Sequence, residues 1–307
     1  MLVSEPIFIS SADKLYEAVV KSIALYGYAP EHNIHDYTYA IDDDTDNIFV
    51  SFADNMGILA KKEKHDPIWW MLAEPLAPAS LRAGILVSFL KNIFQKQGAQ
   101  RANLELMEDT YTSLLKILPD DLQARGPSEV LTAPIFELTM FDPEMRGNTY
   151  KGIRSVVRQF YKAHKVDVVD AKSIQKKVIF DLVARWRNHR TAQDEALDDY
   201  YVRSINEDFL GFDSARAIVV DDVVVGLNGG WNMPQNGRYY KALSLHDYSN
   251  RALGDVMMIE ELTWLKRMKY QTADFGAGSK KITDFKNRFN PSFSYTSYEF
   301  IIEPAII

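Results

Sequence analysis

Hydrophobic and polar positions from Lys241 to the C-terminus follow the spacing of alternating strands and helices. Polar and apolar residues alternate over residues 240–245, which predicts a strand. Apolar residues then recur three or four positions apart, so they share one face of a helix predicted from about 255 to 270: Met258, Leu262, Leu265 and Met268. The loop between the strand and this helix contains Asn250 and Gly254, which interrupt both patterns.

A second strand and a second helix follow in the same order. The short apolar run 272–275 predicts a buried strand, and Gly276 and Gly278 mark the loop after it. The next helix carries Phe285 and Phe289 four positions apart, and a proline two residues later ends it. A final strand is expected to close the chain.

The first half of the chain predicts the same order of elements. Helices are expected over residues 13–24, 80–96 and 109–118, and strands over 48–52, 56–60, 68–73, 102–107 and 136–141. Gly98 is a suitable stop for the second of these helices. Both halves have the same order of elements, which is strands, helix, strand, helix, strand. We therefore expect an internal structural duplication without visible sequence repetition.

Between the halves lies a connection over residues 142–148, followed by a helix whose charge is one-sided. Residues 150–165 contain no acidic residue. Five cations lie within roughly 80° of arc on one side of this helix: Lys151, Arg154, Arg158, Lys162 and Lys165. A solvated helix face is one interpretation. The other is a polyanion site for a tRNA backbone or a nucleotide phosphate.

The second half continues with one more helix and three strands. Its helix is expected over 173–187, with a buried stripe of Ile174, Val178, Leu182 and Trp186. Strands over 215–220, 223–231 and 238–245 are expected to be antiparallel, the first pair turning at Asp221 and Asp222.

Composition limits the class of protein. The 307 residues are 47% hydrophobic and 25% charged, which is ordinary for a soluble protein and allows two domains. No cysteine is present, so thiolate catalysis and cysteine-based zinc sites are excluded. No signal peptide and no bilayer-spanning apolar run is recognised, which predicts a cytoplasmic location. The net charge of −7 argues against general nucleic-acid coating and favours a local basic patch.

The loop before the first of the C-terminal helices has the features of a phosphate site. A strand that leads through a tight loop into a helix supplies free N–H groups and the positive end of a helix dipole. Arg251-Ala252-Leu253-Gly254 at this junction resembles the pyrophosphate loop of the GNAT acyltransferase superfamily, although Val256 stands where that family has a small residue. The resemblance implies that Arg251, Gly254 and Asp255 hold the donor.

The end of the chain resembles a second, related family. Asp274-Phe275-Gly276, followed by Phe285-Lys286 with Phe289 and Pro291, is similar to the C-terminal domain of phosphatidylglycerol lysyltransferases and, less closely, to the Fem peptidyltransferases. These relatives are tandem GNAT-like folds that mostly take their acyl group from aminoacyl-tRNA. The match covers only their soluble part, without a membrane-embedded half.

This resemblance also implies roles for single lysines and arginines. Lys286 matches the lysine thought to stabilise the oxyanion formed during attack on an ester or thioester. Lys151 and Arg154 match a Lys-x-x-Arg pattern on the linker helix, which with Arg158 would bind tRNA.

His246 and Asp247 end the strand that opens into the active cleft of a GNAT-like fold. Either side chain could accept the proton of an attacking amine, directly or through water. The alternative is a strand-end pair that only hydrogen-bonds the loop.

Other polar residues are expected to be structural. His32 and His35 lie three apart without a third ligand cluster, so no metal site is predicted. Glu260 and Glu261 are interpreted as helix-surface acids. The pairs Trp69-Trp70 and Tyr200-Tyr201 are interpreted as core or cleft wall.

The sequence therefore predicts an α/β (α+β) protein of two tandem GNAT-like lobes, residues 1–141 and 142–307, packed around a cleft. Transfer of an acyl or aminoacyl group to an amine or hydroxyl is expected, with the active site in the C-terminal lobe. Aminoacyl-tRNA is the favoured co-substrate and acyl-CoA the alternative, with no tightly bound cofactor. A catalytically inactive binding protein is the third possibility. The acceptor (small molecule, lipid or peptide) and the oligomeric state are left open.

Overall fold

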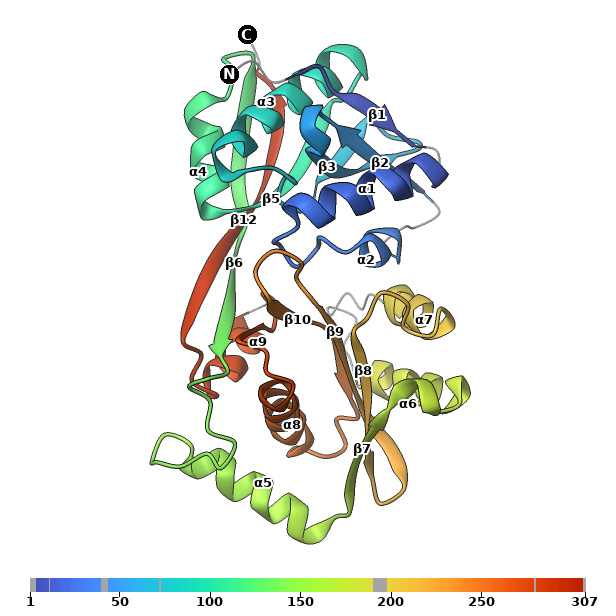
Figure 1. Ribbon diagram of the computed structural model, residues 1–307, viewed down its shortest axis with the longest axis vertical. Coiled ribbons are helices and arrows are strands. Elements are labelled where there is room, and N and C mark those ends of the chain that lie inside the picture. Colours follow the sequence, from blue (N-terminus) through green and yellow to red (C-terminus); the bar gives the residue numbers. More distant parts are fainter. Residues whose placement is uncertain are drawn as a thin grey trace.

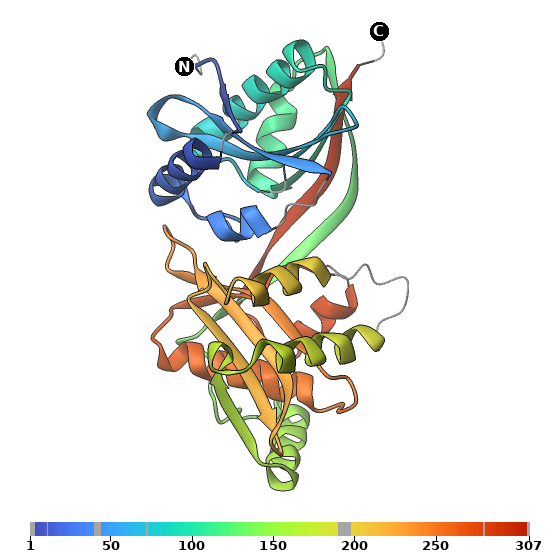
Figure 2. The same cartoon turned by 90° about the vertical axis from the view of Figure 1, so that its right-hand side faces the viewer.

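One twisted sheet runs through the whole molecule and carries helices on both faces (Figure 1). The computed structural model describes residues 4–10, 12–39, 44–71, 73–189, 198–278 and 280–305. Within these residues the strand order is β1-β2-β3-β4-β5-β12-β6-β11-β10-β9-β8-β7. The N-terminal lobe occupies one end of this sheet and the C-terminal lobe the other (Figure 2).

The N-terminal lobe contains, in chain order, β1 (Ile7–Ile9), α1 (Ala12–Tyr26), α2 (Ile34–Tyr39), β2 (Thr45–Ser51), β3 (Gly57–Glu63), β4 (Ile68–Met71), α3 (Ala79–Lys96), β5 (Arg101–Met107), α4 (Glu108–Ile117) and β6 (Leu122–Glu137). Successive residues of β2 and β3 alternate between two cores, as a pleated strand requires. Phe49 and Leu59 pack with α1 and α2, whereas Val50 and Ile58 pack with α3 and α4.

The C-terminal lobe contains α5 (Lys151–Ala163), β7 (Val166–Asp170), α6 (Lys176–Asn188), α7 (Asp198–Asn206), β8 (Ser214–Val220), β9 (Val223–Asn232), β10 (Arg238–His246), α8 (Leu253–Arg267), β11 (Thr272–Asp274), α9 (Lys280–Asn287) and β12 (Phe293–Pro304). Helices α5 and α8 share one core with the sheet. Helices α6 and α7 share another.

Each lobe contains one parallel strand pair joined by a helix, which is the expected duplication. In the N-terminal lobe β4 pairs with β5 from Ile68↔Arg101 to Met71↔Leu104, and α3 connects them. In the C-terminal lobe β10 pairs with β11 from Arg238↔Thr272 to Tyr240↔Asp274, and α8 connects them. The other strand pairs of the described residues are antiparallel.

Two long strands, β6 and β12, belong to both lobes. Strand β12 pairs with β6 along most of its length and with β5 over Ser297–Ile302. Phe300 and Ile302 at its far end are buried in the core of the N-terminal lobe. The boundary proposed at 141/142 therefore separates the helices of the two lobes, while the last strand crosses into the first lobe.

The sequence prediction for β6 was wrong at both ends. It placed a strand at 136–141, whereas β6 covers Leu122–Glu137 and residues 138–140 form a turn. The first half of β6 is largely exposed, so it lacks the alternation that identifies a half-buried strand.

Three predictions about helix faces also need correction. Met268, predicted on the apolar stripe of α8, is exposed and follows the last residue of that helix. The buried stripe of α6 is Ile179, Leu182, Val183 and Trp186, and Val178 is exposed. Glu261 is not a surface acid: it is fully buried, and Arg216 donates a hydrogen bond to its carboxylate. Helix α8 packs between α5 and the sheet, so even this polar position lies inside.

The lobes are held together by hydrogen bonds from the second lobe to backbone carbonyls of the first. The indole of Trp231 donates to Pro30 at 3.0 Å, and the backbone of Gln235 donates to Gly27 at 2.9 Å. Gly211 lies against His35 with a φ of +84°, and a Cβ there would lie 2.4 Å from the Cβ of His35. A glycine is therefore required at this contact.

Candidate functional site

Strands β10 and β11 separate after Tyr240 and Asp274, the last pair of their register. Beyond that point β10 continues to His246, while the chain after β11 forms a loop over residues 275–278 and then enters α9. A register shift between Tyr240 and Leu243 accompanies the separation. We call residues 241–246 and 275–278 the β10–β11 fork.

Lys286 holds the loop of the fork. Its ammonium donates to the carbonyl oxygens of Phe275 at 2.5 Å, Gly276 at 2.7 Å and Ala277 at 3.3 Å. Burial, followed by the charge of Lys241, lowers its pKa to about 8. Because an ammonium has three protons, all of them are directed at the backbone in this arrangement.

Lys241 is the second lysine of the fork, and its surroundings differ. Its ammonium lies 5.0 Å from the ring centroid of Phe275 and has no hydrogen-bond acceptor within the described part of the chain. Burial lowers its pKa to about 8, against the opposing charge of Glu261. Unlike the ammonium of Lys286, this ammonium is therefore not committed to backbone acceptors.

His246 lies at the end of β10, beside the start of α8. Burial, and next the charge of Lys241, lower the pKa of His246 to about 4. Its ring contacts the ring of Tyr248 in a tilted arrangement, with 4.5 Å between centroids. The imidazole is therefore neutral at pH 7 and able to accept a proton.

Asp247 is engaged in structural contacts. Arg185 donates to its Oδ2 at 3.0 Å, and the backbone of Ser249 donates to its Oδ1 at 2.9 Å. Burial alone raises the pKa of Asp247, but these hydrogen bonds and the guanidinium outweigh burial and leave the pKa below its ordinary value. Of the two predicted bases, the geometry favours His246.

The loop at the start of α8 adjoins His246. A Cβ added to Gly254 would lie 3.5 Å from the His246 ring and 3.6 Å from Phe285, so the fold itself would tolerate alanine there. Asp255 is buried and accepts from Arg288 at 3.0 Å, which ties α8 to α9. Arg251 is exposed at the same loop.

A cavity of about 290 Å³ lies between the lobes. Helix α2 and strands β3 and β4 form its wall on the N-terminal side, and α7 and β10 form its wall on the C-terminal side. Its lining is aromatic and acidic: Glu31, Asp36, Tyr37, Leu59, Lys61, Trp70, Ala73, Tyr200, Tyr201, Tyr240 and Ala242. The Tyr240 hydroxyl would lie 3.3 Å from a Cβ on Gly276, so this wall adjoins the fork.

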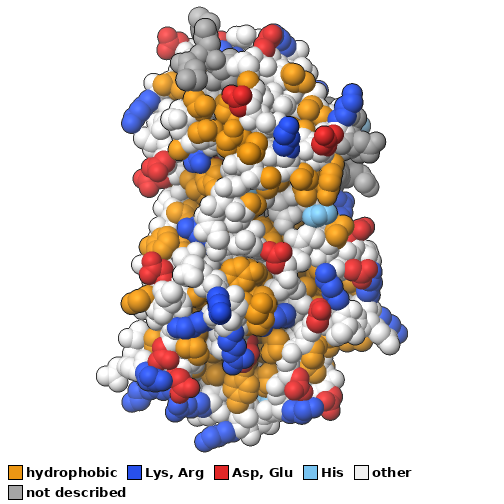
Figure 3. Space-filling view, in the orientation of Figure 1, with side chains coloured by type: hydrophobic (Ala, Val, Ile, Leu, Met, Phe, Trp, Pro, Cys, Tyr) orange, Lys and Arg blue, Asp and Glu red, His pale blue; other side chains and the backbone are white. Residues whose placement is uncertain are grey.

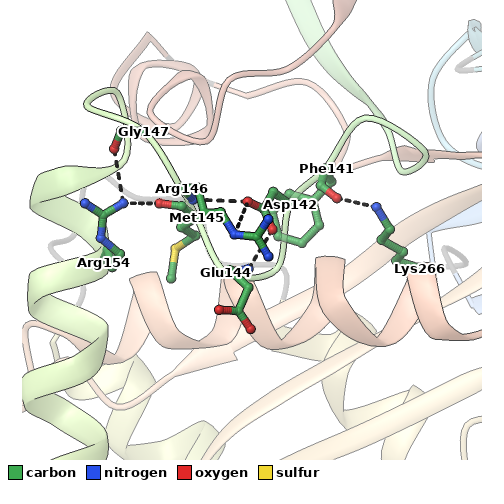
Figure 4. A network of polar contacts seen from close by, with 8 residues as sticks. All are labelled: Phe141, Asp142, Glu144, Met145, Arg146, Gly147, Arg154 and Lys266. Atoms are coloured by element: carbon green, nitrogen blue, oxygen red, sulfur yellow. Dashed lines mark hydrogen bonds and ion pairs between the residues drawn. The ribbon is translucent and has the colours of Figure 1, made fainter.

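The predicted basic stripe lies on α5, at the end of the molecule remote from the N-terminal lobe (Figure 1). Arg154 donates to the carbonyls of Met145 and Gly147 and closes the connection between the lobes (Figure 4). Lys165 pairs with Asp167 and Asp222 at 3.2 and 3.3 Å. Lys151, Arg158 and Lys162 remain exposed, in a region where basic side chains gather (Figure 3).

The stripe and the fork are therefore separate parts of the C-terminal lobe. Of the predicted site residues, the structure places His246, Gly254 and Lys286 at the fork. It places Lys151, Arg154 and Arg158 on α5 instead.

No group of three metal-ligating side chains occurs among the described residues. His32 accepts from the backbone N–H groups of Tyr28 and Ala29 and contacts the Glu74 carbonyl at 2.7 Å. Burial lowers the pKa of His32 to about 4, so it is a neutral structural residue. No helix in the described part of the chain is both long and apolar enough to cross a membrane.

Sequence reasoning missed Lys241, Glu31 and Asp36. Lys241 lies within an alternating strand and reads as an ordinary outward residue. Glu31 and Asp36 are acids that belong to no recognised motif. Their proximity to the aromatic wall results from lobe packing, which no local motif records.

Comparison with known proteins was made at the level of sequence and of structure. No protein-family model and no curated protein matches the sequence. A tandem GNAT protein from the clavulanic acid biosynthesis pathway is similar in structure, with a TM-score of 0.56, 12% identity and coverage of 99% of each chain. The chain has a tandem GNAT-like fold.

Two further structures share this tandem GNAT-like fold. The C-terminal domain of a candidate lysylphosphatidylglycerol synthetase from Agrobacterium fabrum has a TM-score of 0.66 and 12% identity, covering 94% of this chain and 91% of that one. FemX has a TM-score of 0.62 and 11% identity, covering 96% of each chain. The expected fold, including its likeness to both relatives, is thus confirmed.

Proposed function

We propose that this protein transfers an acyl or aminoacyl group from an activated donor to an amine or hydroxyl acceptor at the β10–β11 fork. The supporting observation is that a neutral imidazole, His246, adjoins the start of α8 at Gly254, while the Lys241 ammonium lies on the same strand. A base, a helix N-terminus and an available cation are what acyl transfer uses.

Each group has a role in the proposed reaction. The acceptor attacks the carbonyl carbon of the donor ester or thioester, and His246 takes the proton that the acceptor loses. Lys241 stabilises the oxyanion of the tetrahedral intermediate, which collapses with release of the donor alcohol or thiol. The expelled oxygen or sulfur recovers a proton from the imidazolium. Lys286 is a positioning residue, because its protons already hold the carbonyls of the loop.

Aminoacyl-tRNA is the favoured donor. The resemblance to lysyltransferases and Fem enzymes supports it, and the exposed cations of α5 offer a surface for a nucleic-acid backbone. Acyl-CoA is the second candidate. It is favoured by Arg251 and Gly254 at the start of α8 and by the likeness to a tandem GNAT protein.

The test is a transfer assay with three single variants. Purified protein is incubated with tRNA charged with labelled amino acids, or with labelled acetyl-CoA, together with a mixed extract of lipids and amines. We expect label in a new amide or ester, a loss of about 100-fold or more in His246→Gln, and a loss of similar size in Lys241→Met. Lys280→Met, an exposed lysine paired with Asp284, is the matched control and should keep full activity.

Melting temperature separates the two lysines of the fork. Lys241→Met should leave it unchanged or raise it, because a buried charge is removed. Lys286→Met should lower it, because three carbonyls lose their donor. Absence of transfer from both donors, or full activity in His246→Gln, would reject the proposed function and favour a binding protein.

A further inference from the structure

The cavity between the lobes is built mainly from aromatic and acidic side chains. Four of its aromatic rings come from Trp70 on β4, Tyr200 and Tyr201 on α7, and Tyr240 on β10. Their faces supply the negative side of an aromatic quadrupole. Because the walls belong to both lobes, a ligand in the cavity would contact both.

Carboxyl groups gather around this cavity, and Lys61, whose charge acts on Asp36, is the one cation among the described residues that line it. Burial, followed by the charges of Glu105, Asp36 and Asp274, raises the pKa of Glu31 well above its ordinary value. The same four carboxyl groups act on the Tyr240 hydroxyl. They therefore surround a common region at the wall of the cavity.

The partners of these carboxyl groups are mostly neutral. Asp36 accepts from the Tyr200 hydroxyl at 2.9 Å, and Glu105 accepts from Ser297 at 2.7 Å. Asp274 accepts from the backbone of Gly276 at 2.8 Å, and its nearest cation, Arg238, is 3.7 Å away. Within the described part of the chain, Glu31 accepts from no other side chain.

Glu31 is the carboxyl group best placed for a ligand. It lines the main cavity and also a smaller neighbouring cavity, which reaches Glu105 and Tyr295. Part of its surface remains open although it lies deep between the lobes, because it faces these two spaces. A positive charge bound beside Glu31 would face more carboxyl groups than cations.

We propose that this cavity binds an organic cation, a protonated amine or guanidinium on a short apolar stem, with its charge against Glu31 and Asp36. Aromatic walls and carboxylates together recognise such a group, through cation–π contact and charge-assisted hydrogen bonds. An inorganic cation would need several converging ligands, and no group of three is found among the described residues.

This cation site adds to the proposed function. It rests on that function only for the source of the cation. Tyr240 joins the cavity wall to Gly276, so a bound cation would adjoin the loop of the fork. Two sources share this chemistry. The cation is either the acceptor amine itself or a basic side chain on the acyl group that is transferred.

Calorimetry on the full chain, without any donor, tests the cavity. Pentylamine is compared with 1-pentanol and with pentanoate, which have similar stems and different charge. We expect pentylamine to bind at least 10-fold more tightly than either. Glu31→Gln and Asp36→Asn should each weaken pentylamine by about 10-fold or more. Glu144→Gln, an exposed acid in the connection at 142–148, is the matched control and should bind like the parent.

Three outcomes of this experiment would contradict the cation site. The proposal would be overturned if pentylamine and pentanol bound equally, or if both acid variants kept the affinity of the parent. It would also be overturned if pentylamine did not bind at about 10 mM, a concentration at which even weak ligands bind. The acid variants remain informative, because neutralising a buried carboxyl should not unfold the chain. Circular dichroism checks this point.

A second experiment with donor present separates the two sources. Acylation of pentylamine itself indicates the acceptor, whereas inhibition competitive with the donor indicates the acyl group. Loss of all transfer activity with intact pentylamine binding would reject the proposed function and leave the cation site standing.

Discussion

The pKa values of the ionisable residues at the fork and the cavity depend on burial more than on neighbouring charge. Burial is the first cause of the lowered pKa of Lys241 and His246 and of the raised pKa of Asp36. Each shift favours the neutral form, as expected when a charge leaves water. Of the three, only His246 is mostly neutral at pH 7, whereas Lys241 and Asp36 are mostly charged and titrate close to neutral pH.

Asp36 gives a prediction for the pH dependence of stability. Burial raises its pKa from 3.8 to about 6, against a hydrogen bond from Tyr200 and the charge of Lys61. Between these values the folded chain keeps a proton that the unfolded chain has released. The contribution of Asp36 to stability is thus present at low pH and is lost as pH rises through 6.

Asp36→Asn should remove this loss. Its free energy of unfolding should exceed that of the parent at pH 7.5, by up to about 3 kcal/mol, and match the parent near pH 4. Urea unfolding at the two pH values measures the difference. An equal effect at both would show that Asp36 does not titrate in this range. The variant would be more stable while binding an organic cation less well.

At the scale of elements, the sequence predicted the helices and strands whose apolar residues recur with a regular period. The apolar stripe of α8 and the alternation of β10 gave these elements within a few residues. Gly98 was correctly read as the stop of α3 and has a φ of +68°. The turn at Asp221 and Asp222 was also correct, and both residues have positive φ.

Elements that are short or exposed could not be predicted in this way. Strand β1 has three residues and α2 has six, which is too few to establish a period. The exposed half of β6 contains a glycine and a proline that indicate a loop. For the site, the Arg251 to Asp255 loop and Lys286 carried motifs, whereas Lys241 and the acids of the cavity depend on contacts distant in sequence.

Helix α5 allows a test of the predicted polyanion surface. Reversing Arg158 and Lys162 together to Glu should weaken binding of unfractionated tRNA and reduce its salt dependence by about two units of slope, roughly one for each lost phosphate contact. Both side chains are exposed, so the melting temperature should hold. Lys116→Glu on α4, in the other lobe, is the control. Unchanged affinity and slope in the double variant would make the stripe a solvated face.

For the whole molecule, the shared strands predict that the two lobes unfold together. Phe300, on the last strand, is 1% exposed and packs in the core of the N-terminal lobe. Phe300→Ala should cost about 3–5 kcal/mol and still give one cooperative transition. Calorimetry measures this. Two separate transitions, with only one moved, would show that the lobes fold independently.

The placement of β12 also determines the order in which the chain can fold during synthesis. Many proteins complete an N-terminal domain while the rest is still being made. Here the N-terminal lobe lacks one strand of its sheet, next to β5, until residues 293–304 have left the ribosome. Until then β5 presents an open edge and the hydrophobic surface that Phe300 later covers, both of which favour aggregation. Newly made chains should therefore depend on chaperones until β12 has been synthesised and can pair with β5.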